Sequence, residues 1–291
     1  MPRALMSTIR RRTSAHSSFP RETAMPKKKS IPGADRPPPP EDEQLHFIYD
    51  SVAKRWGRDE PWVRDELIAW EWILDKARRL SSNGTILDCG CGTGNYCRPL
   101  SECANRVIGI DSSTQMIEEA VRRNEGRQNV EYIVGDMRNL GTVVEEGTVD
   151  LCLSIFGFCC LPSLYDVRAF LRAMRKALRS GGHAIIQIPH PLDGFYDTKS
   201  AWIRERGRPT SYFDSGVTIQ RELRTVSGDW LPVGRHHYTL SEYLNAFVNA
   251  KFRLIETREP FPDVSTLAKH PDLLPESRLP SSMVFVCDTI E

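Results

Sequence analysis

The sequence has almost no net charge and no long apolar run. Its 39 Lys and Arg residues nearly cancel its 38 Asp and Glu residues, which leaves a formal charge of +1. A domain that binds nucleic acid usually has a clear basic excess, so we do not expect nucleic acid as a partner. No stretch reaches the roughly 20 apolar residues of a membrane-spanning helix, and the first residues lack the apolar core of a secretory signal. We therefore expect no association with a membrane.

The eight cysteines follow no metal-binding or disulfide pattern. No pair has the Cys-x-x-Cys spacing of a structural zinc site, so we expect no metal. A chain of this length does not need disulfides to fold, and free thiols indicate a reducing compartment, for which we expect the cytoplasm. Residues 1–22 are rich in Arg and Ser and poor in acidic residues, which leaves an organelle transit peptide as an alternative. Whether residues 1–24 belong to the mature protein is not decided by the sequence.

Composition divides the chain after residue 43. Residues 1–43 hold a run of three lysines and a run of four prolines, which cannot build a packed core, and we predict a disordered tail. Residues 44–291 are predicted to form one domain. Residues 44–82 read as two leading helices, and residues 190–238 read as an insertion rich in aromatic residues, Arg and Gly.

Between these segments strand and helix patterns alternate. Short apolar runs predict strands near residues 85–88, 106–110, 130–134, 149–155 and 183–188, and later ones near 252–257 and 282–287. Helices are predicted between them, including 93–103 and 164–178, the latter ended by two glycines. This order predicts an α/β fold: a doubly wound, mostly parallel seven-stranded sheet with a helical N-terminal lid and an insertion after the fifth strand. Such sheets bind ligands at the carboxyl ends of their strands.

Residues 88–95 read Asp-Cys-Gly-Cys-Gly-Thr-Gly-Asn and follow the first sheet strand. Glycines in such a turn adopt positive φ and let the backbone approach a ligand closely. The spacing Gly-x-Gly-x-Gly differs from the Gly-x-Gly-x-x-Gly of dinucleotide sites, and Asp88 would repel a pyrophosphate placed there. A cationic ligand without phosphates suits this turn better.

With these features the chain resembles the class I S-adenosylmethionine-dependent methyltransferases over about residues 85–188. The resemblance implies S-adenosylmethionine as the cofactor. It implies that Asp88 lies near the methionine amino group, that Asp111 accepts from the ribose hydroxyls and that Asp136 accepts from the adenine amino group. Capping of a helix by Asp111 and a turn role for Asp136 are the alternatives. The other residues that the resemblance places around the cofactor are Tyr49, Gly90, Cys91, Gly92, Ser112, Met116, Met137, Ser154, Ile155 and Phe156.

The segment from Tyr49 to Trp56 is similar to the leading helix of the small-molecule members of this family, which closes over the cofactor. A helix that only packs on the sheet is the alternative. Methyl transfer is an in-line displacement at a carbon that the sulfonium already activates, so a general base is needed only if the acceptor must lose a proton. His190, directly after the fifth strand, and His237, at the end of the insertion, are the candidate bases. A hydrogen-bonding or surface role is the alternative for each.

The sequence thus predicts an enzyme that methylates an O, N or C atom of a small organic metabolite. Aromatic residues in the insertion suit an enclosed pocket for such an acceptor. Its arginines, Arg221 among them, either bind an acidic acceptor or form a solvated rim. The alternatives are a tRNA or protein methyltransferase with the same cofactor domain, a nicotinamide-dependent oxidoreductase, and a catalytically silent module that binds the cofactor. The identity of the acceptor and the oligomeric state are not written in the sequence.

Overall fold

The computed structural model describes residues 42–57, 63–81, 83–195, 200–205 and 209–290. The predicted tail lies outside these residues except for its last two positions, where the first helix begins at Asp42. None of the helices in the described part of the chain is long and apolar enough to cross a membrane.

Seven strands form the large sheet, in the order β3-β2-β1-β4-β5-β10-β9. All neighbours pair in parallel except β10, which is antiparallel to both β5 and β9. The predicted doubly wound, mostly parallel seven-stranded fold is confirmed. The strands are β1 (Thr85–Cys89), β2 (Arg106–Asp111), β3 (Val130–Val134), β4 (Val149–Ile155), β5 (Leu178–Pro189), β9 (Phe252–Arg258) and β10 (Ser282–Thr289).

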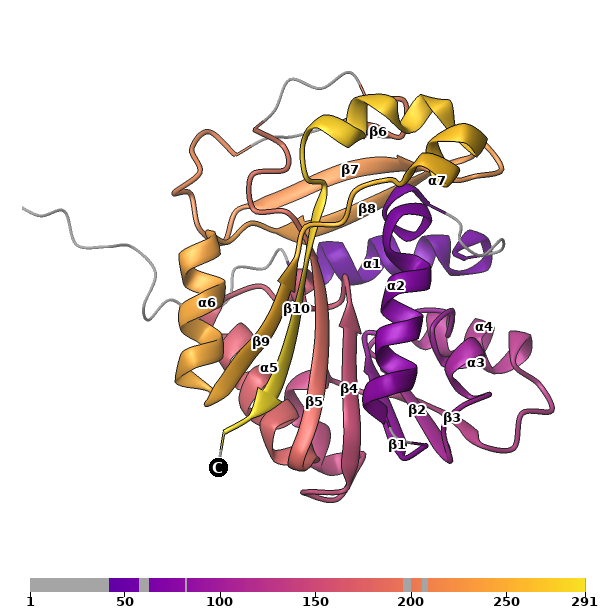
Figure 1. Ribbon diagram of the computed structural model, residues 1–291, viewed down its shortest axis with the longest axis vertical. Helices are drawn as coiled ribbons and strands as arrows, with labels where there is room; N and C mark the ends of the chain where they lie inside the picture. The colour runs from indigo at the N-terminus through magenta and orange to yellow at the C-terminus, as the bar shows by residue number, and fades with distance from the viewer. Residues whose placement is uncertain (1–41, 58–62, 82, 196–199, 206–208, 291) are drawn as a thin grey trace, which may run out of the picture. The chain divides into compact units, whose positions relative to one another are not determined.

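Helices cover both faces of this sheet, which is why its central strands are apolar on both sides. In β1, for example, Ile86 and Leu87 are both fully buried but belong to the cores on opposite faces. One face carries α2 (Arg64–Ser81), α3 (Cys97–Leu100) and α4 (Thr114–Arg123). The other carries α5 (Leu164–Ala177) and α6 (Leu240–Asn249). Figure 1 shows α2 and α5 on opposite sides of the sheet.

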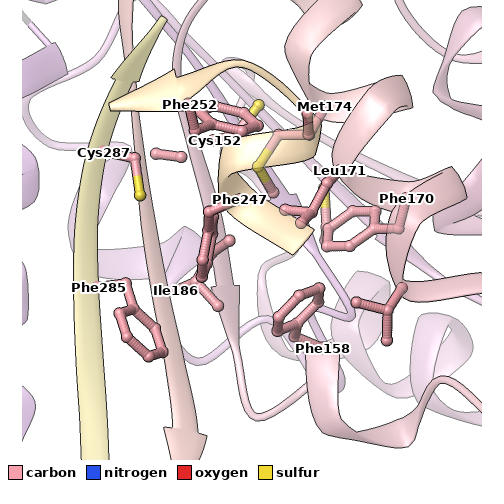
Figure 2. Close-up of a cluster of buried hydrophobic side chains, with 14 of the residues drawn as sticks. Cys152, Phe158, Phe170, Leu171, Met174, Ile186, Phe247, Phe252, Phe285 and Cys287 are labelled. Atoms are coloured by element: carbon pink, nitrogen blue, oxygen red, sulfur yellow. The ribbon is translucent and has the colours of Figure 1, made fainter. Parts of the chain in front are cut away.

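The core under α5 and α6 contains a cluster of aromatic rings among its aliphatic side chains (Figure 2). Phe158 stands at its centre, with ring centroids 5.8 Å from Phe170 and 5.9 Å from Phe247. Phe247 in turn lies 5.1 Å from Phe285 of β10. Rings at these separations bury large apolar areas and join the helices to the sheet that carries the ligand-binding edge.

Two helix boundaries differ from the sequence-based expectation. The helix predicted over 93–103 is reduced to α3, because Gly94 has φ +79° and cannot continue a right-handed helix. The helix predicted over 164–178 ends at Ala177, close to the predicted end, but the two glycines after residue 180 do not terminate it. Strand β5 begins at Leu178, and its pairing with β4 is irregular at that point, so the glycines lie within the strand. Both differences follow from backbone conformations that the apolar pattern does not report.

The insertion contains a second, three-stranded sheet that the sequence did not predict. Strands β6 (Ile203–Glu205), β7 (Thr218–Arg224) and β8 (Trp230–His236) pair antiparallel in the order β6-β7-β8. In β7 the buried positions are Ile219 and Arg221. Because one of these inward-facing residues is charged, the strand lacks the alternation of apolar and polar residues that would predict it. Figure 1 shows this small sheet across one end of the large one.

Residues 42–57, here called the lid, contain α1 (Asp42–Val52) and η1 (Ala53–Arg55) and pack against β8. A Cβ on Gly234 of β8 would lie 2.0 Å from the Leu45 side chain, so only glycine allows this close approach. The remaining short helices are η2 (Met137–Thr142), η3 (Phe158–Cys160), α7 (Val264–Lys269) and η4 (Pro271–Arg278).

Candidate functional site

A cavity of about 510 Å³ lies at the carboxyl ends of the parallel strands. Its walls come from the ends of β1, β2 and β4, from the lid, and from β7 and β8 of the small sheet. The sequence predicted a site at this edge, and the cavity extends it to the insertion. The predicted residues Tyr49, Asp88, Gly90, Cys91, Gly92, Asp111, Ser112, Met116, Asp136, Met137, Ile155 and Phe156 all line it.

The glycine turn after β1 is fixed to the end of β2. The Gly90 N–H donates to the Ile110 carbonyl at 2.8 Å, and the Gly92 N–H donates to Asp111 Oδ2 at 2.9 Å. Gly90 has φ +76°, and a Cβ there would lie 3.0 Å from the Gly157 Cα. The turn therefore needs glycine both for its conformation and for the approach of a second backbone segment.

Two carboxylates flank this turn. Asp88 is only 2% exposed and accepts a hydrogen bond from the Cys97 thiol at 3.4 Å. Burial raises the pKa of Asp88 to about 7, and the nearby charge of Asp111 adds to the rise. Asp111 accepts from the Gly92 N–H and, through Oδ1, from the Ser113 N–H at 2.9 Å. A cation bound between these two groups would stabilise the ionised form of Asp88.

Asp136 lies in the cavity wall, but its carboxylate is occupied by Arg138. Arg138 Nη2 is 2.7 Å from Asp136 Oδ2, and Arg138 Nη1 bridges to Asp166 Oδ1 at 2.6 Å. Burial acts to raise the pKa of Asp136, but the hydrogen bonds and charge of Arg138 outweigh it and lower the pKa. Any contact of Asp136 with an adenine amino group therefore competes with this ion pair, which the sequence analysis did not foresee.

The end of β4 contributes a strained residue to the wall. Phe156 has φ +59°, a conformation that costs a bulky residue of order 1–3 kcal/mol and often marks a functional site. Its N–H donates to the Gln187 carbonyl at 2.9 Å, which helps to hold the backbone there. Ser154, two residues earlier, is fully buried and lies behind the wall rather than in it. The structure thus separates Ser154 from the other residues of the predicted set.

The lid lies over the glycine turn. A Cβ on Gly92 would be 3.3 Å from Trp56 Nε1, and the Trp56 ring meets the Tyr49 ring edge-on at 5.5 Å. The Tyr49 hydroxyl donates to the Gly234 carbonyl of β8 at 2.8 Å. Tyr49 therefore joins the part of the cavity near the glycine turn to the part near the small sheet.

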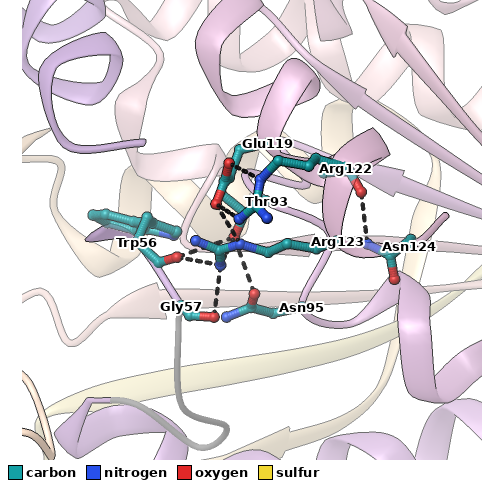
Figure 3. A network of polar contacts seen from close by, with 9 residues as sticks. Trp56, Gly57, Thr93, Asn95, Glu119, Arg122, Arg123 and Asn124 are labelled. Atoms are coloured by element: carbon teal, nitrogen blue, oxygen red, sulfur yellow. Dashed lines mark hydrogen bonds and ion pairs between the residues drawn. The ribbon is translucent and has the colours of Figure 1, made fainter. Parts of the chain in front are cut away.

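A polar network fastens the end of the lid to α4 and the glycine turn (Figure 3). Arg123 Nη1 donates to the carbonyls of Trp56 and Gly57 and to Thr93 Oγ1, while its Nε donates to Glu119 at 2.8 Å. Hydrogen bonds from Arg122 and Arg123 lower the pKa of Glu119 to about 2, so Glu119 is ionised at neutral pH. The network holds the lid against the turn.

Neither candidate general base lines the cavity. The Leu192 N–H donates to His190 Nδ1 at 3.2 Å, and His190 Nε2 is 3.0 Å from Glu259 Oε1, so both ring nitrogens are engaged. His237 is fully buried, with Nε2 2.8 Å from the Tyr212 carbonyl, and burial lowers its pKa. Since a general base must reach the proton that it removes, we do not carry either histidine forward as a catalytic residue.

Charged residues in the wall near the small sheet were largely missed by the sequence analysis. The buried residues Arg64, Asp65, Glu66, Arg221 and Arg235 line the cavity, and so does Asp193, whose side chain is 14% exposed. Only Arg221 had been considered, among arginines expected to form a solvated rim or to bind an acidic acceptor. Their burial depends on how β7 and β8 face the lid, which no local pattern reports. Among the described residues no group of three or more His, Cys, Asp or Glu is placed to hold a metal ion.

Comparison with known proteins agrees with this geometry. Residues 86–182 match the family described as methyltransferase domain. Over 144 residues the chain is 26% identical to a demethylmenaquinone methyltransferase from Staphylococcus saprophyticus, covering 48% of this chain and 60% of that protein. The chain therefore spans about three fifths of the length of this relative. The chain therefore contains a methyltransferase domain, as the resemblance predicted.

Solved structures of this methyltransferase family share its fold. An S-adenosylmethionine-dependent methyltransferase from Mesorhizobium loti matches with a TM-score of 0.57 at 24% identity, over 75% of this chain and 97% of that one. One from Clostridium acetobutylicum matches with a TM-score of 0.58 at 15% identity, over 86% and 99% of the two chains. The predicted fold and methyltransferase domain are confirmed, and the cofactor and the roles of single residues stay predictions.

The cavity of this methyltransferase fits S-adenosylmethionine. The ligand has cationic groups and no phosphates, and Asp88 and Asp111 supply negative charge beside the glycine turn. At Gly90 and Gly92 the absence of a Cβ leaves space that any side chain would fill. Met116 and Met137 offer apolar, adaptable surface in the same wall, as a flat ring system requires.

Proposed function

We propose that this methyltransferase transfers a methyl group from S-adenosylmethionine to an O, N or C atom of a small organic molecule. The observation that carries the proposal is the continuous cavity, which joins the predicted cofactor residues at the glycine turn to a separate wall formed by the insertion. A second substrate can occupy that wall while the cofactor occupies the turn. The name of the matched relative, demethylmenaquinone methyltransferase, also points to a small-molecule acceptor.

In this proposal the chain holds the cofactor through groups that the structure brings together. Asp111 binds the ribose hydroxyls, Asp88 interacts with the amino end, and Met116 and Met137 pack against the adenine. S-adenosylmethionine, when bound, supplies a methyl group that its sulfonium already activates. Ile155 and Phe156 line the way from this end of the cavity toward the small sheet.

The chain's own contribution is then to position the acceptor and exclude water. The lid residues Tyr49 and Trp56 cover the turn, and the bond from Tyr49 to Gly234 ties the lid to the acceptor wall. Placing the two reactants in one closed site replaces a bimolecular encounter by a unimolecular step. This mechanism needs no general base unless the acceptor must first lose a proton.

The proposal is tested first on cofactor binding. S-adenosylmethionine and its demethylated product are titrated calorimetrically into the wild-type protein, Asp111→Ala and the control Asp75→Ala, which removes an exposed carboxylate on α2. We expect saturable binding by the wild type and the control, and a loss of at least about tenfold in affinity for Asp111→Ala, since charge-assisted bonds are lost. Equal binding by Asp111→Ala would remove the ribose role, and no binding by the wild type would contradict the cofactor site.

Turnover is tested separately, with labelled S-adenosylmethionine and a panel of small phenols, amines and carboxylic acids. Transfer of label to a small molecule supports the proposal. Binding of cofactor with transfer only to tRNA or protein would favour that alternative acceptor class. Binding without transfer to any of these would favour a catalytically silent module.

A further inference from the structure

Two buried arginines share one carboxylate in the wall formed by the small sheet. The side chains of Arg221 in β7 and Arg235 in β8 are 5% and 8% exposed. Arg221 forms an ion pair with the Asp193 carboxylate. Arg235 Nη2 donates to the Asp193 backbone carbonyl at 2.7 Å and lies 3.7 Å from its carboxylate oxygen. The Asp193 carboxylate therefore lies close to both guanidinium groups.

The positive charge of Arg235 is incompletely matched. Its Nε is buried and has no hydrogen-bond acceptor among the residues that the structure describes. Arg64, the third arginine near Asp193, is paired with Asp65 at 3.0 Å, so it brings its own counter-charge. A buried cation without a full set of partners is costly, since removing it from water is repaid only by close, well-aligned acceptors. Burial and the charge of Arg221 both lower the pKa of Arg235, because both disfavour its protonated, cationic form.

Arg235 lies on the cavity side of the small sheet, toward the cofactor end. Cys160 lines the same cavity, and its Sγ lies 3.8 Å from the carbonyl oxygen of Gly234, the residue before Arg235. Cys160 Sγ is also 3.6 Å from the Tyr49 hydroxyl. The apolar side chains of Ile219 and Leu223, from the same face of β7 as Arg221, line the cavity beside the arginines.

We propose that the methyl acceptor carries a carboxylate that binds Arg235 in this wall, with its apolar body against Ile219 and Leu223. The inference rests on the proposed function and narrows its acceptor to small organic acids. A guanidinium group presents parallel N–H donors that match the two oxygens of a carboxylate. A carboxylate here would give the Arg235 Nε an acceptor and would place a further negative charge beside this buried guanidinium group.

The test compares acids with their neutral amides in the protein saturated with S-adenosylhomocysteine. Benzoate is titrated beside benzamide, and hexanoate beside hexanamide, because each pair differs little except in charge. We expect at least one carboxylate to bind about tenfold or more tightly than its amide. Equal binding within both pairs, or no carboxylate binding to the loaded protein, would overturn the inference. If S-adenosylhomocysteine itself does not bind, the result contradicts the proposed function instead.

Variants then assign the preference to the arginine. Arg235→Gln removes the charge and keeps a polar side chain. Arg172→Gln is the control, because Arg172 is exposed on α5 and does not line the cavity. We expect Arg235→Gln to lose the preference for the acid while it binds S-adenosylhomocysteine within about twofold of the wild type, and Arg172→Gln to keep both. A retained preference in Arg235→Gln would show that this arginine only positions Asp193. The comparison of acid with amide in the wild type does not depend on how the variant folds.

Discussion

Replacing Asp88 with Asn removes a carboxyl group that is buried and has no ion pair with any residue that the structure describes. Its pKa is about 7 in the folded protein, against 3.8 for an ordinary aspartate, chiefly because burial disfavours the charged form. Asn keeps the size and an oxygen that can accept from the Cys97 thiol. The variant therefore isolates the charge. We expect two effects of opposite sign: the unliganded protein becomes more stable at pH 8, and it binds S-adenosylmethionine more weakly.

The magnitude follows from proton linkage. Between pH 3.8 and about pH 7 the folded wild type holds a proton on Asp88 that the unfolded chain has released, so its stability falls as pH rises. The full loss is at most about 4 kcal/mol, and about 3 kcal/mol of it falls between pH 5 and pH 8. Asp88→Asn has no such loss. The difference in unfolding free energy, variant minus wild type, should therefore grow by up to about 3 kcal/mol from pH 5 to pH 8.

Urea unfolding of the unliganded proteins at the two pH values measures this difference. Asp75→Asn, which changes an exposed carboxylate on α2, is the control and should shift by less than about 0.5 kcal/mol. Calorimetry at pH 8 measures the second effect, for which we expect at least tenfold weaker binding. A pH-independent difference in stability would refute the high pKa of Asp88. Unchanged affinity would refute its contact with the cofactor.

Two further predictions concern the lid and the glycine turn. Arg123→Ala should weaken S-adenosylmethionine binding by about tenfold, because it cuts the bonds that hold the lid, whereas Arg122→Ala, whose side chain is 69% exposed, should change affinity less than twofold in the same titration. Gly94→Ala should cost about 2 kcal/mol more in urea unfolding than Gly147→Ala. Both glycines have positive φ, but only at Gly94 would the new Cβ meet Tyr132 Oη, at 2.3 Å.

Each of these two predictions would be contradicted if the variant and its control gave the same result. Equal affinity losses for the two arginine variants would show that the hydrogen bonds from Arg123 to the lid carbonyls do not account for the loss. Equal costs for the two glycine variants would show that backbone strain alone, about 1–2 kcal/mol, governs both positions.

The sequence was sufficient for the large sheet and the glycine turn because their signals are local. Strand and helix alternation, the spacing of the glycines and the acidic residues at the ends of β1 and β2 and after β3 are patterns of neighbouring residues along the chain. Local signals failed where tertiary contacts decide. Gly94 shortened the predicted helix through a positive φ, and β7 stayed unrecognised because Arg221 occupies an inward position of its alternating pattern.

The residues of the candidate site also fall into those that local sequence predicted and those that only tertiary contacts placed. From Asp88, Gly90 and Asp111 the sequence by itself was enough to predict a methyltransferase domain and its cofactor, because one short turn and the next strand carry those groups. Only the tertiary structure decided that Asp136 is held by Arg138 and that His190 is engaged with Glu259 outside the cavity wall. The acceptor wall likewise depends on residues far apart in the chain, among them Asp193 and Arg235. Their charges come together only when the small sheet and the lid fold against each other. The periodicity of apolar residues does not report such a contact between distant segments.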